Sequence, residues 1–543
     1  MTGLQLATTT DHPWWQTAVI YQIYPRSFQD STGNGIGDLA GVIKRLDYLA
    51  DTLGVDAIWL SPFFPSPMKD FGYDVSDYCN VDPLFGDLAT FDRLVVGSHA
   101  RNLKVIIDWV PNHSSDQHPW FIESRSSPNN PKRDWYVWRD PKPDGAPPNN
   151  WAAAFGGGAW EWDQTTSQYY LHSFLKEQPD LNWRNPAVEE AMLDTLRFWL
   201  DRGVDGFRID VAHHIMKDPE LSDNPVAAEI SDDFALTPYA TQRHVNDRGH
   251  PDVHEIFRKV RALLDRYHPP RYSVGEIHEY DWPTWASYYG ENLDGLHMPF
   301  NFAMLQIPWT AEGIREVVER VEEVVPAGAW PNYVLGNHDE IRMTTRLGHH
   351  QSRIAAMLLL TLRGTPTLYY GDEIGLGQAD LPPHLQQDPW GRTVPGKGRD
   401  GCRTPMQWTD GEGSGFTDPG VRPWLPLSGD AAGRNVSKQV ASPNSLVNLY
   451  RRLLVIRDEE AALQVGDYRS LESDRGVFAY LRDDGQSRLA IILNFTGDAQ
   501  PAGAIATSGS GHVVISTGLD RAGPLALEEL ELGPHEGVII RLD

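Results

Sequence analysis

The chain has 543 residues, of which 41% are hydrophobic and 22% charged, and its formal net charge at pH 7 is −27. Such a length predicts a large catalytic domain with one or two smaller attachments. The negative charge argues against nucleic acid and anionic membranes as partners, because both surfaces would repel the chain, and it is compatible with a neutral ligand.

The N-terminal residues Met1 to Trp15 lack a basic stretch followed by an apolar one, and no apolar run reaches the roughly 18 residues of a membrane span. The two cysteines, Cys79 and Cys402, provide neither a disulfide framework nor a zinc-binding spacing. A reducing compartment is the usual setting of such a chain. We therefore predict a cytoplasmic protein.

Short apolar runs that end in polar residues or glycine recur along the chain, and most are followed by an amphipathic helical pattern. They cover residues 18–24, 57–61, 105–109, 206–210, 272–276, 295–299, 333–337 and 367–371. Eight strands that alternate with helices predict an α/β fold of the closed (β/α)8 TIM barrel type. A doubly wound parallel sheet is the alternative.

Two segments depart from this alternation. Residues 112–181 are rich in Pro, Gly, Asn and Trp and show little helical period, so they predict a loop-rich subdomain inserted after the third strand. From about residue 466 the pattern changes to short strands separated by turns, which predicts a C-terminal all-β sandwich domain. The predicted barrel thus covers 1–111 and 182–465, the insertion 112–181 and the sandwich 466–543.

Charged residues stand where several of the predicted strands end. In (β/α)8 enzymes the chemistry lies at the carboxyl ends of the strands, where the βα loops open on one face. Arg208 and Asp210 are two residues apart on one strand and share a face. An isolated Arg-x-Asp is more often a structural ion pair, but Asp108, Glu276 and Asp339 stand at matching ends of other strands. Together they predict one polar site.

The motifs around these residues resemble the α-amylase superfamily of family 13 glycoside hydrolases, and within it the oligo-1,6-glucosidase and α-glucosidase branch. They are DWVPNH at 108–113, QPDLN at 178–182, GFRIDVA at 206–212, GEI at 275–277, VLGNHD at 334–339 and RDGCRTPMQW at 399–408. The resemblance extends from about Trp14 to the C-terminus, and its ordered set of motifs is highly specific.

The resemblance implies a catalytic role for three carboxyl groups. Asp210 would be the nucleophile, kept ionised by Arg208, and Glu276 the general acid, kept protonated by desolvation and nearby acids. Asp339 would hold sugar hydroxyls and favour the oxocarbenium-like transition state. His113 and His338 match the histidines that bind the sugar in subsite −1.

The resemblance also implies a pocket that is closed at one end. The segment 70–74 resembles the family's D-x-G-Y-D motif, in which Asp70 and Tyr73 hold and stack on the terminal glucose, and Arg399 would pair with Asp70. Phe155 and Val211 are further expected substrate-binding residues. A closed subsite predicts an exo-acting enzyme, whereas a simple surface ion pair between Asp70 and Arg399 is the alternative.

Catalysis of this kind needs no cofactor, but residues 30–38 have oxygen side chains at alternate positions with glycines between them, as calcium loops do. The expected ligands of a structural Ca²⁺ or Mg²⁺ are Asp30, Thr32, Asn34, Ile36 and Asp38. The family usually has an acid where Asn34 stands, so a metal-free turn held by hydrogen bonds is the alternative.

The sequence therefore predicts a retaining α-glucosidase that releases glucose from the non-reducing ends of short α-glucosides, with transglucosylation as a side activity. A dedicated transglucosidase or a sucrose or maltose isomerase is the alternative within the class. A non-catalytic relative, such as the amino-acid transporter heavy chains, is the alternative from another class, but those proteins have lost catalytic acids. In the resembled branch a Val after the nucleophile accompanies α-1,6 preference, and Val211 matches it. Ala212 and the pair 213–214 depart from the α-1,6 relatives, so the resemblance implies tolerance of both α-1,4 and α-1,6 linkages.

Overall fold

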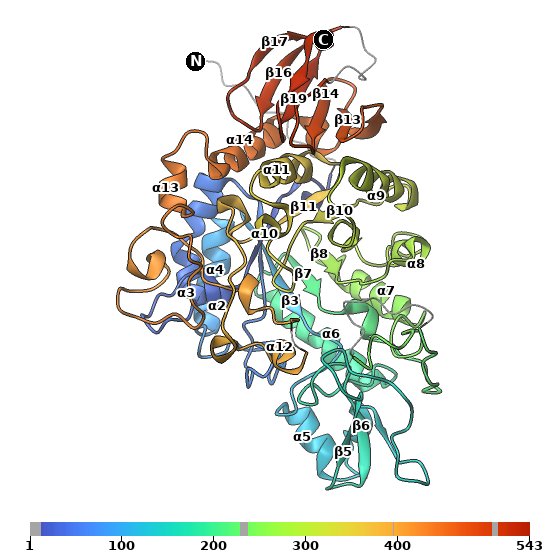
Figure 1. Cartoon of the computed structure of the whole chain (residues 1–543). Helices are drawn as coiled ribbons and strands as arrows, with labels where there is room; N and C mark the ends of the chain where they lie inside the picture. The colour runs from blue at the N-terminus through green and yellow to red at the C-terminus, as the bar shows by residue number, and fades with distance from the viewer. Residues whose placement is uncertain (1–11, 228–236, 395, 502–508) are drawn as a thin grey trace.

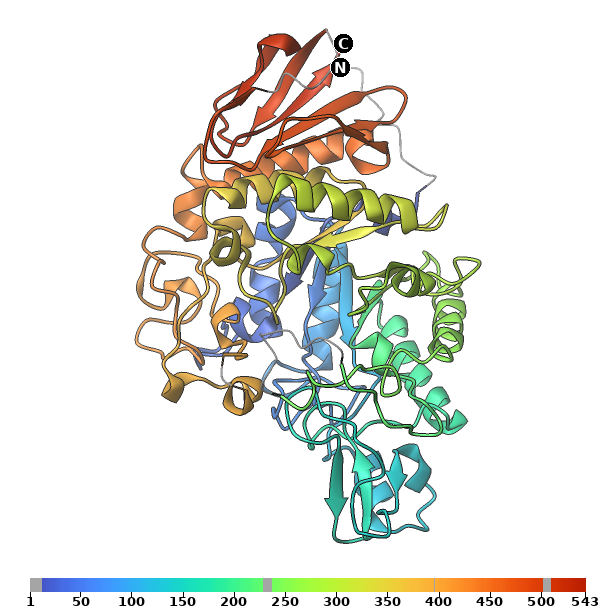
Figure 2. The same cartoon turned by 45° about the vertical axis from the view of Figure 1, so that its right-hand side comes forward.

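The computed structural model describes residues 12–227, 237–394, 396–501 and 509–543. An eight-stranded parallel sheet lies at the centre of the molecule among helices, a segment with its own small sheet lies at one end, and an antiparallel sheet lies at the other (Figure 1). In the turned view the C-terminal sheet again stands over the barrel helices, at the end away from the inserted segment (Figure 2).

The central sheet confirms the predicted barrel, and each of its strands falls within or beside a predicted run. The strands are β1 (Ile20–Ile23), β2 (Ala57–Leu60), β3 (Lys104–Trp109), β7 (Gly206–Ile209), β8 (Tyr272–Gly275), β9 (Met298–Pro299), β10 (Asn332–Val334) and β11 (Thr365–Tyr369). Their order is β10-β11-β1-β2-β3-β7-β8-β9. The Asn332 side chain links the first and last strands, because its Nδ2 donates to Pro299 O and its Oδ1 accepts from Asn301 N.

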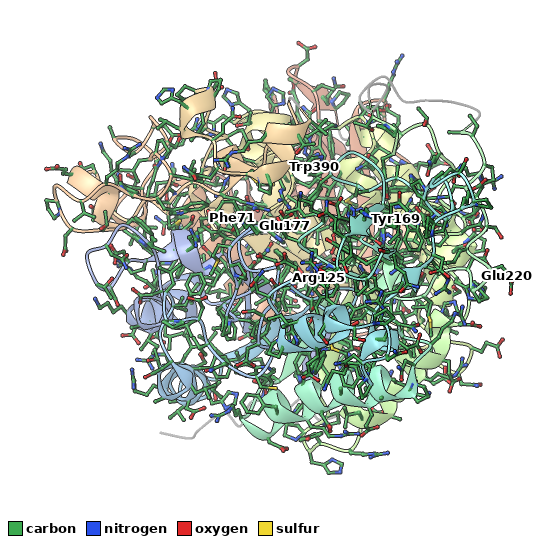
Figure 3. The ribbon with its side chains drawn as sticks, turned by 90° about the horizontal axis from the view of Figure 1, so that it is seen from below. Phe71, Arg125, Tyr169, Glu177, Glu220 and Trp390 are labelled. Atoms are coloured by element: carbon green, nitrogen blue, oxygen red, sulfur yellow. The ribbon has the colours of Figure 1, made fainter. Side chains whose placement is uncertain are left out.

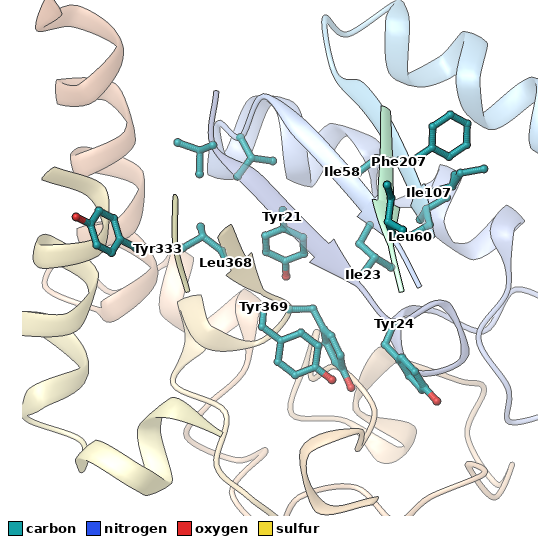
Figure 4. Packing of buried hydrophobic residues seen from close by; sticks show 14 of the residues in the cluster. Tyr21, Ile23, Tyr24, Ile58, Leu60, Ile107, Phe207, Tyr333, Leu368 and Tyr369 are labelled. Atoms are coloured by element: carbon teal, nitrogen blue, oxygen red, sulfur yellow. The ribbon is translucent and has the colours of Figure 1, made fainter. Parts of the chain in front are cut away.

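Alternation along the strands separates the interior of the barrel from its outer layer. Ile20, Trp59 and Val274 belong to one buried cluster inside the barrel. Tyr21 and Ile58 point the other way and join the large cluster that packs the strands against the surrounding helices (Figure 4). The strands are buried on both faces, which explains why they read as continuous apolar runs.

Helices lie around the barrel, and several of them begin at capping residues. They are α3 (Leu39–Lys44), α4 (Leu88–His99), α6 (Pro186–Asp201), α7 (Val253–Leu264), α8 (Trp282–Ser287), α9 (Ala311–Val324), α11 (Gln351–Thr361) and α14 (Leu446–Glu459). Asp87 accepts from Thr90 N at the start of α4, and Asn185 accepts from Ala187 N at the start of α6. The other α-helices are α1 (Trp14–Thr17), α2 (Pro25–Phe28), α5 (Pro119–Ser126), α10 (Met343–Leu347), α12 (Pro389–Thr393), α13 (Val436–Val440) and α15 (Ala461–Gln464).

The segment after β3 contains helix α5 and a three-stranded antiparallel sheet in the order β4-β6-β5. The strands are β4 (Trp138–Arg139), β5 (Trp160–Asp163) and β6 (Gln168–Leu171). Phe121 stacks on Trp138 with ring centroids 5.7 Å apart and meets Tyr170 edge-on, so aromatic rings supply much of this segment's core.

The C-terminal segment forms the predicted β-sandwich. Its six-stranded antiparallel sheet has the order β12-β13-β14-β19-β16-β17, and β15 pairs with β18 in a separate ribbon. The strands are β12 (Asp467–Leu471), β13 (Val477–Asp483), β14 (Arg488–Asn494), β15 (Gln500–Pro501), β16 (Ser510–Ser516), β17 (Gly523–Ala526), β18 (Glu531–Leu532) and β19 (Gly537–Leu542). Phe478 and Ile491 face the barrel helices, whereas Ala479 and Ile492 belong to a second core on the other face with Leu532 of the ribbon.

Three further sequence predictions bear on this fold. The domain boundaries at residues 112, 182 and 466 stay predictions. In the parts of the chain that the structure describes, no helix combines the length and the apolar character needed to cross a bilayer. Cys79 and Cys402 are both free, as their spacing predicted.

Candidate active site

The central strands present their polar side chains to the interior of the barrel. Gly206, Arg208 and Asp210 alternate with Phe207 and Ile209, which pack outward in the large core. Because the outward residues are apolar, the alternation directs Arg208 and Asp210 inward at the carboxyl end of β7. The same alternation directs Asp108 on β3 and Glu276, just after β8, into the interior of the barrel.

Arg208 is the centre of this polar cluster. Its Nη1 lies 2.7 Å from Asp108 Oδ1 and 2.7 Å from Asp210 Oδ1, and its Nη2 lies 2.7 Å from Glu276 Oε2. Its side chain is 1% exposed, and the guanidinium carbon lies 5.2 Å from the centre of the Trp59 ring. One cation thus serves three carboxyl groups in a site without bulk water, which makes full ionisation of all three costly.

The two expected catalytic acids receive unequal numbers of hydrogen bonds. Burial raises the pKa of Asp210 well above its usual range, and the one donor from Arg208 does not compensate. Burial also raises the pKa of Glu276, but Arg208, His278 and the backbone N of Val211 outweigh it, so that pKa lies well below its usual range. These directions are opposite to those predicted from sequence, because Glu276 takes more of the available donors.

Val211 shapes the turn that follows β7. Its φ of 35° lies in the left-handed region, which a β-branched residue adopts only at a cost of about 1–2 kcal/mol. In this conformation its backbone N donates to Glu276 Oε2 at 2.9 Å. Val211 as a whole is 9% exposed, and its hydrogen bond to the acid is made by the backbone.

Asp339 lies beside two arginines at the far side of the site. Arg399 Nη1 and Arg403 Nη2 donate to Asp339 Oδ1 at 3.1 and 2.7 Å. Burial raises the pKa of Asp339, but His338, Arg399 and Arg403 outweigh it and hold that pKa below its usual range. Asp339 is therefore an anion, and its side chain remains 25% exposed.

Asp70 is held in a tight turn that directs it to Arg399. Asp74 accepts hydrogen bonds from the backbone N of Lys69 and of Asp70, and Gly72 has a φ of 112° that favours glycine. Arg399 Nη2 donates to Asp70 Oδ1 at 2.7 Å, and both side chains are buried. The predicted contact is present, and it is not a surface ion pair.

The guanidinium of Arg399 has a further partner that the sequence did not reveal. Asp388 accepts from both Nε and Nη2 of Arg399, at 2.9 and 2.7 Å, and is itself fully buried. The guanidinium carbon also lies 5.0 Å from the centre of the Phe155 ring, which stacks on Trp390. Trp390 is labelled in the view from below (Figure 3). Phe155 therefore packs against the guanidinium that pairs with Asp70 and Asp388.

The predicted histidines lie among the same groups and are neutral. Burial lowers the pKa of His113 to about 4 and that of His338 to about 3. His338 Nε2 lies 2.5 Å from Tyr73 OH, and its Nδ1 lies 2.8 Å from Gln22 Nε2. Gln178 connects His113 to Asp70, with its Nε2 3.1 Å from His113 Nε2 and 3.2 Å from Asp70 Oδ2. The expected residues thus form one connected cluster.

Comparison with known proteins places this cluster in a family. Residues 22–466 match the model described as alpha amylase, catalytic domain. The chain belongs to the alpha-amylase family. A probable alpha-glucosidase from Rhizobium meliloti (strain 1021) is 45% identical over 503 residues, 90% of each chain, and an oligo-1,6-glucosidase from Parageobacillus thermoglucosidasius is 38% identical over 89% of this chain and 90% of its own. The predicted family is confirmed, and the chain is a glycoside hydrolase.

Solved structures of the alpha-amylase family share the whole architecture. An alpha-glucosyl transfer enzyme, XgtA, is 43% identical with a TM-score of 0.91, and the alignment covers 98% of this chain and 100% of that one. An isomaltulose synthase mutant from Erwinia rhapontici, in complex with sucrose, is 33% identical with a TM-score of 0.87 over the same shares. The predicted (β/α)8 fold is therefore confirmed by comparison as well as by topology.

In the predicted metal loop of this alpha-amylase family member, the carboxylates accept hydrogen bonds from protein groups. Asp30 accepts hydrogen bonds from the backbone N of Thr32, Gly33 and Gly35 and from Thr417 Oγ1. Asp38 accepts from the backbone N of Ser31 and Gly41, and Asn34 Oδ1 from Ile36 N. Lone pairs that would bind a cation are thus directed at N–H groups. The donor set does not fit a metal in this arrangement, and the metal site stays a prediction.

A chelation experiment tests that loop. Because its oxygens are already hydrogen-bonded, adding EDTA or millimolar Ca²⁺ is expected to move the melting temperature by less than about 1 °C. The measurement is a thermal unfolding scan of protein that has been dialysed against each solution. A rise of several degrees with Ca²⁺ that the Asp30→Asn variant lacks would show that the loop rearranges to hold the ion.

Some contributing residues were not assigned from sequence. Gln178 and Arg403 stand inside recognised motifs, so the motifs located them without giving a role. Asp388 and His278 lie outside those motifs, and no spacing relates Asp388 to Arg399 or indicates that His278 contacts the acid. Only the folded chain brings these pairs together.

Proposed function

We propose that this glycoside hydrolase is a retaining, exo-acting α-glucosidase that acts on short α-glucosides. The single observation that carries the proposal is the placement of Asp210 and Glu276 on one guanidinium, with the buried pair of Asp70 and Arg399 next to Asp339. Carboxyl groups that share an arginine stand close together, which supports a double displacement, in which they are about 5–5.5 Å apart.

In the first half of the proposed reaction an Asp210 oxygen forms a bond to the anomeric carbon while the bond from that carbon to the glycosidic oxygen breaks. Glu276 gives its proton to the leaving oxygen. In the second half Glu276 takes a proton from water, the water oxygen bonds to the same carbon, and Asp210 leaves. The product is α-glucose, with its configuration retained.

The hydrogen bonds of Glu276 imply a change before this chemistry. Glu276 Oε2 is bound to Arg208 and to Val211 N, so in the proposed reaction this oxygen releases Arg208 before it reaches a glycosidic oxygen. Loss of that cation raises the proton affinity of Glu276, and the freed guanidinium then stabilises Asp210 as an anion. The same movement thus produces a protonated acid and an ionised nucleophile.

The exo preference follows from the charges at the closed end. Asp70 and Arg399 are buried against each other, and Phe155 packs over the guanidinium. A saccharide that continued past this pair would have to displace a buried ion pair, which is costly. The terminal glucose is therefore the unit that fits.

A product assay tests the proposal. Purified protein is incubated with maltose, isomaltose, sucrose and trehalose, and released glucose and its initial anomer are followed by NMR. We expect α-glucose from at least one disaccharide and slow release from polymeric starch. A β-anomer as first product would contradict retention, and a rapid loss of starch viscosity with little free glucose would contradict the exo action.

Glucosyl transfer is a second candidate, and the likeness to XgtA, whose structure is described as that of an alpha-glucosyl transfer enzyme, favours it. A glucosyl-enzyme can be released by a sugar hydroxyl in place of water, so transfer products are expected to increase with disaccharide concentration. The ratio of trisaccharide to free glucose, measured at low and high maltose, distinguishes a hydrolase with side activity from a dedicated transferase.

Linkage preference is expected to depend on Val211, which follows the proposed nucleophile. Replacing Val211 by Thr or Gly should raise the ratio of maltose to isomaltose turnover by roughly tenfold, because one methyl-scale steric difference is worth about 1–3 kcal/mol. Val211→Ile, which keeps the branched side chain, is the matched control and should not raise the ratio. If the maltose to isomaltose ratio of the Thr and Gly variants stays within about twofold of that of the unmodified enzyme, Val211 only packs the rim of the barrel.

A further inference from the structure

A histidine directly contacts the proposed general acid. His278 stands two residues after Glu276, beyond the end of β8, and its Nε2 lies 2.9 Å from Glu276 Oε1. The imidazole stacks on Phe302, with ring centroids 4.6 Å apart and planes 10° apart. The side chain is 34% exposed, so it lies at the edge of the buried cluster. The aromatic contact fixes the ring that makes the hydrogen bond.

The two oxygens of Glu276 have different partners. Oε2 receives hydrogen bonds from Arg208 and from Val211 N, whereas among the described residues Oε1 contacts His278 Nε2, which donates to it in the Nε2-protonated tautomer. A charge-assisted hydrogen bond of this length is roughly twice as strong as a neutral one. The orientation of the carboxyl group therefore depends on one imidazole on one side and on the Arg208 cluster on the other.

We propose that His278 is a positioning residue that holds Oε1 of Glu276 and keeps the carboxyl group aligned when Oε2 separates from Arg208. The proposal rests on the proposed function, in which Glu276 is the general acid and base. His278 does not touch the reacting carbon in this scheme, and it acts only through Glu276.

Several charged or titratable groups surround this pair. Arg208, Asp210 and Asp108 face the Glu276 side of the contact, and His213, Glu279 and Glu340 lie within electrostatic range of His278. His213 Nδ1 lies 3.2 Å from the backbone O of Glu276, and its Nε2 is buried without a hydrogen-bond partner in the described part of the chain. Arg208 thus binds Oε2 of the acid from one side, and His278 binds Oε1 from the other.

The contact has a predictable effect on pH dependence. A donor on Oε1 stabilises the carboxylate form and lowers the pKa of Glu276. The enzyme needs the protonated form to begin, so activity is lost as pH rises through that pKa. Removing the donor raises the pKa, and the alkaline limb of kcat/KM should then move to higher pH.

Two replacements separate the hydrogen bond from the packing. His278→Phe retains a ring that can stack on Phe302 and loses the donor, whereas His278→Gln retains an amide donor. His254→Gln is the matched control, because His254 also makes an Nε2 contact, to Ser287 Oγ at 3.2 Å, and packs on an aromatic ring, Tyr288. Each variant is assayed as the full chain, with a melting curve alongside.

The readout is kcat/KM against pH for a disaccharide and for 4-nitrophenyl α-glucoside, whose leaving group needs little protonation. In His278→Phe we expect the alkaline limb of kcat/KM to move to higher pH by roughly one pH unit. We also expect kcat/KM for the disaccharide to fall about tenfold more than for the aryl glucoside, because only the former depends on the acid. His278→Gln should restore most of the pH position of the alkaline limb and most of the disaccharide kcat/KM. His254→Gln should match the unmodified enzyme in both readouts.

An alkaline limb of His278→Phe within about 0.2 pH unit of the unmodified enzyme, or equal losses on both substrates, would overturn the proposal. If His278→Phe does not fold, His278→Asn takes its place, because its shorter side chain does not reach Oε1. An unmodified enzyme that releases no glucose from any disaccharide would instead overturn the proposed function, so the two failures are distinguishable.

Discussion

Asp210→Asn is expected to lower turnover of an aryl α-glucoside by several orders of magnitude without loss of the fold. The change removes the proposed nucleophile but keeps an oxygen that can accept from Arg208, which lies 2.7 Å away. It also reduces the crowding of three carboxyl groups around one guanidinium, so the melting temperature should stay equal or rise. Steady-state kinetics and a melting curve provide both measurements.

Asp56→Asn is the matched control for this change. Asp56 is a carboxyl group just before β2, at the amino end of the strand and away from the site, where its Oδ2 accepts from Val19 N at 2.7 Å. Its replacement should leave turnover near that of the unmodified enzyme. Near-normal turnover by Asp210→Asn would remove Asp210 from the nucleophile role.

An external nucleophile separates the roles of the two acids. With azide, Asp210→Ala should give β-glucosyl azide, because the anion attacks from the side that the nucleophile occupied. Glu276→Ala should give α-glucosyl azide, because azide then replaces water in the second displacement. NMR of the products identifies each anomer, and the reverse stereochemistry would exchange the two roles.

Much of the barrel could be predicted because local sequence and tertiary position agree. Val105, Ile106 and Ile107 form a continuous apolar run because β3 is buried on both faces, and the alternation around Arg208 fixes which side chains face inward. The same period explains why Asp108, Arg208 and Asp210 could be expected to meet. Register confirms it, since Asp108 and Arg208 are paired across β3 and β7.

The distribution of hydrogen bonds within the site could not be predicted in the same way. Whether Arg208 supports Asp210 or Glu276 more strongly depends on the turn at Val211, whose left-handed φ brings its N to Glu276. That conformation is rare for a β-branched residue, so no local rule would predict it. The reversed pKa directions follow from this turn and from His278, and both are tertiary effects.

The pairing of Arg399 shows a second limit of prediction from the sequence. Asp70 and Arg399 are separated by 329 positions and were linked only by family resemblance, whereas Asp388 is 11 positions from Arg399 and was not linked at all. The resemblance points to the residues that recur at the site. It does not show which acceptors a buried guanidinium has for its N–H groups, whereas the structure does.

Asp70→Ala is expected to lower kcat/KM for a disaccharide by roughly two orders of magnitude, since unpaired buried polar groups cost about 1–3 kcal/mol each. The substitution should weaken substrate binding more than it lowers the stability of the fold. Arg399 keeps its two side-chain contacts with Asp388 and its contact with Asp339, so its guanidinium is not left without an anion. What the variant loses is the carboxylate that, in the proposed function, accepts from the terminal glucose.

Asp388→Ala is the matched comparison for that variant, because it removes the other acidic partner of Arg399. Asp388 is fully buried and accepts from Nε, Nη2 and the backbone N of Arg399, so its loss should cost about 3–5 kcal/mol of folding free energy. We therefore expect Asp388→Ala to melt at a much lower temperature, and Asp70→Ala to melt near the unmodified protein but to turn over its substrate slowly. If Asp70→Ala instead keeps kcat/KM within about twofold while losing stability, Asp70 is a structural partner of Arg399 and the closed end of the pocket must be formed by other groups.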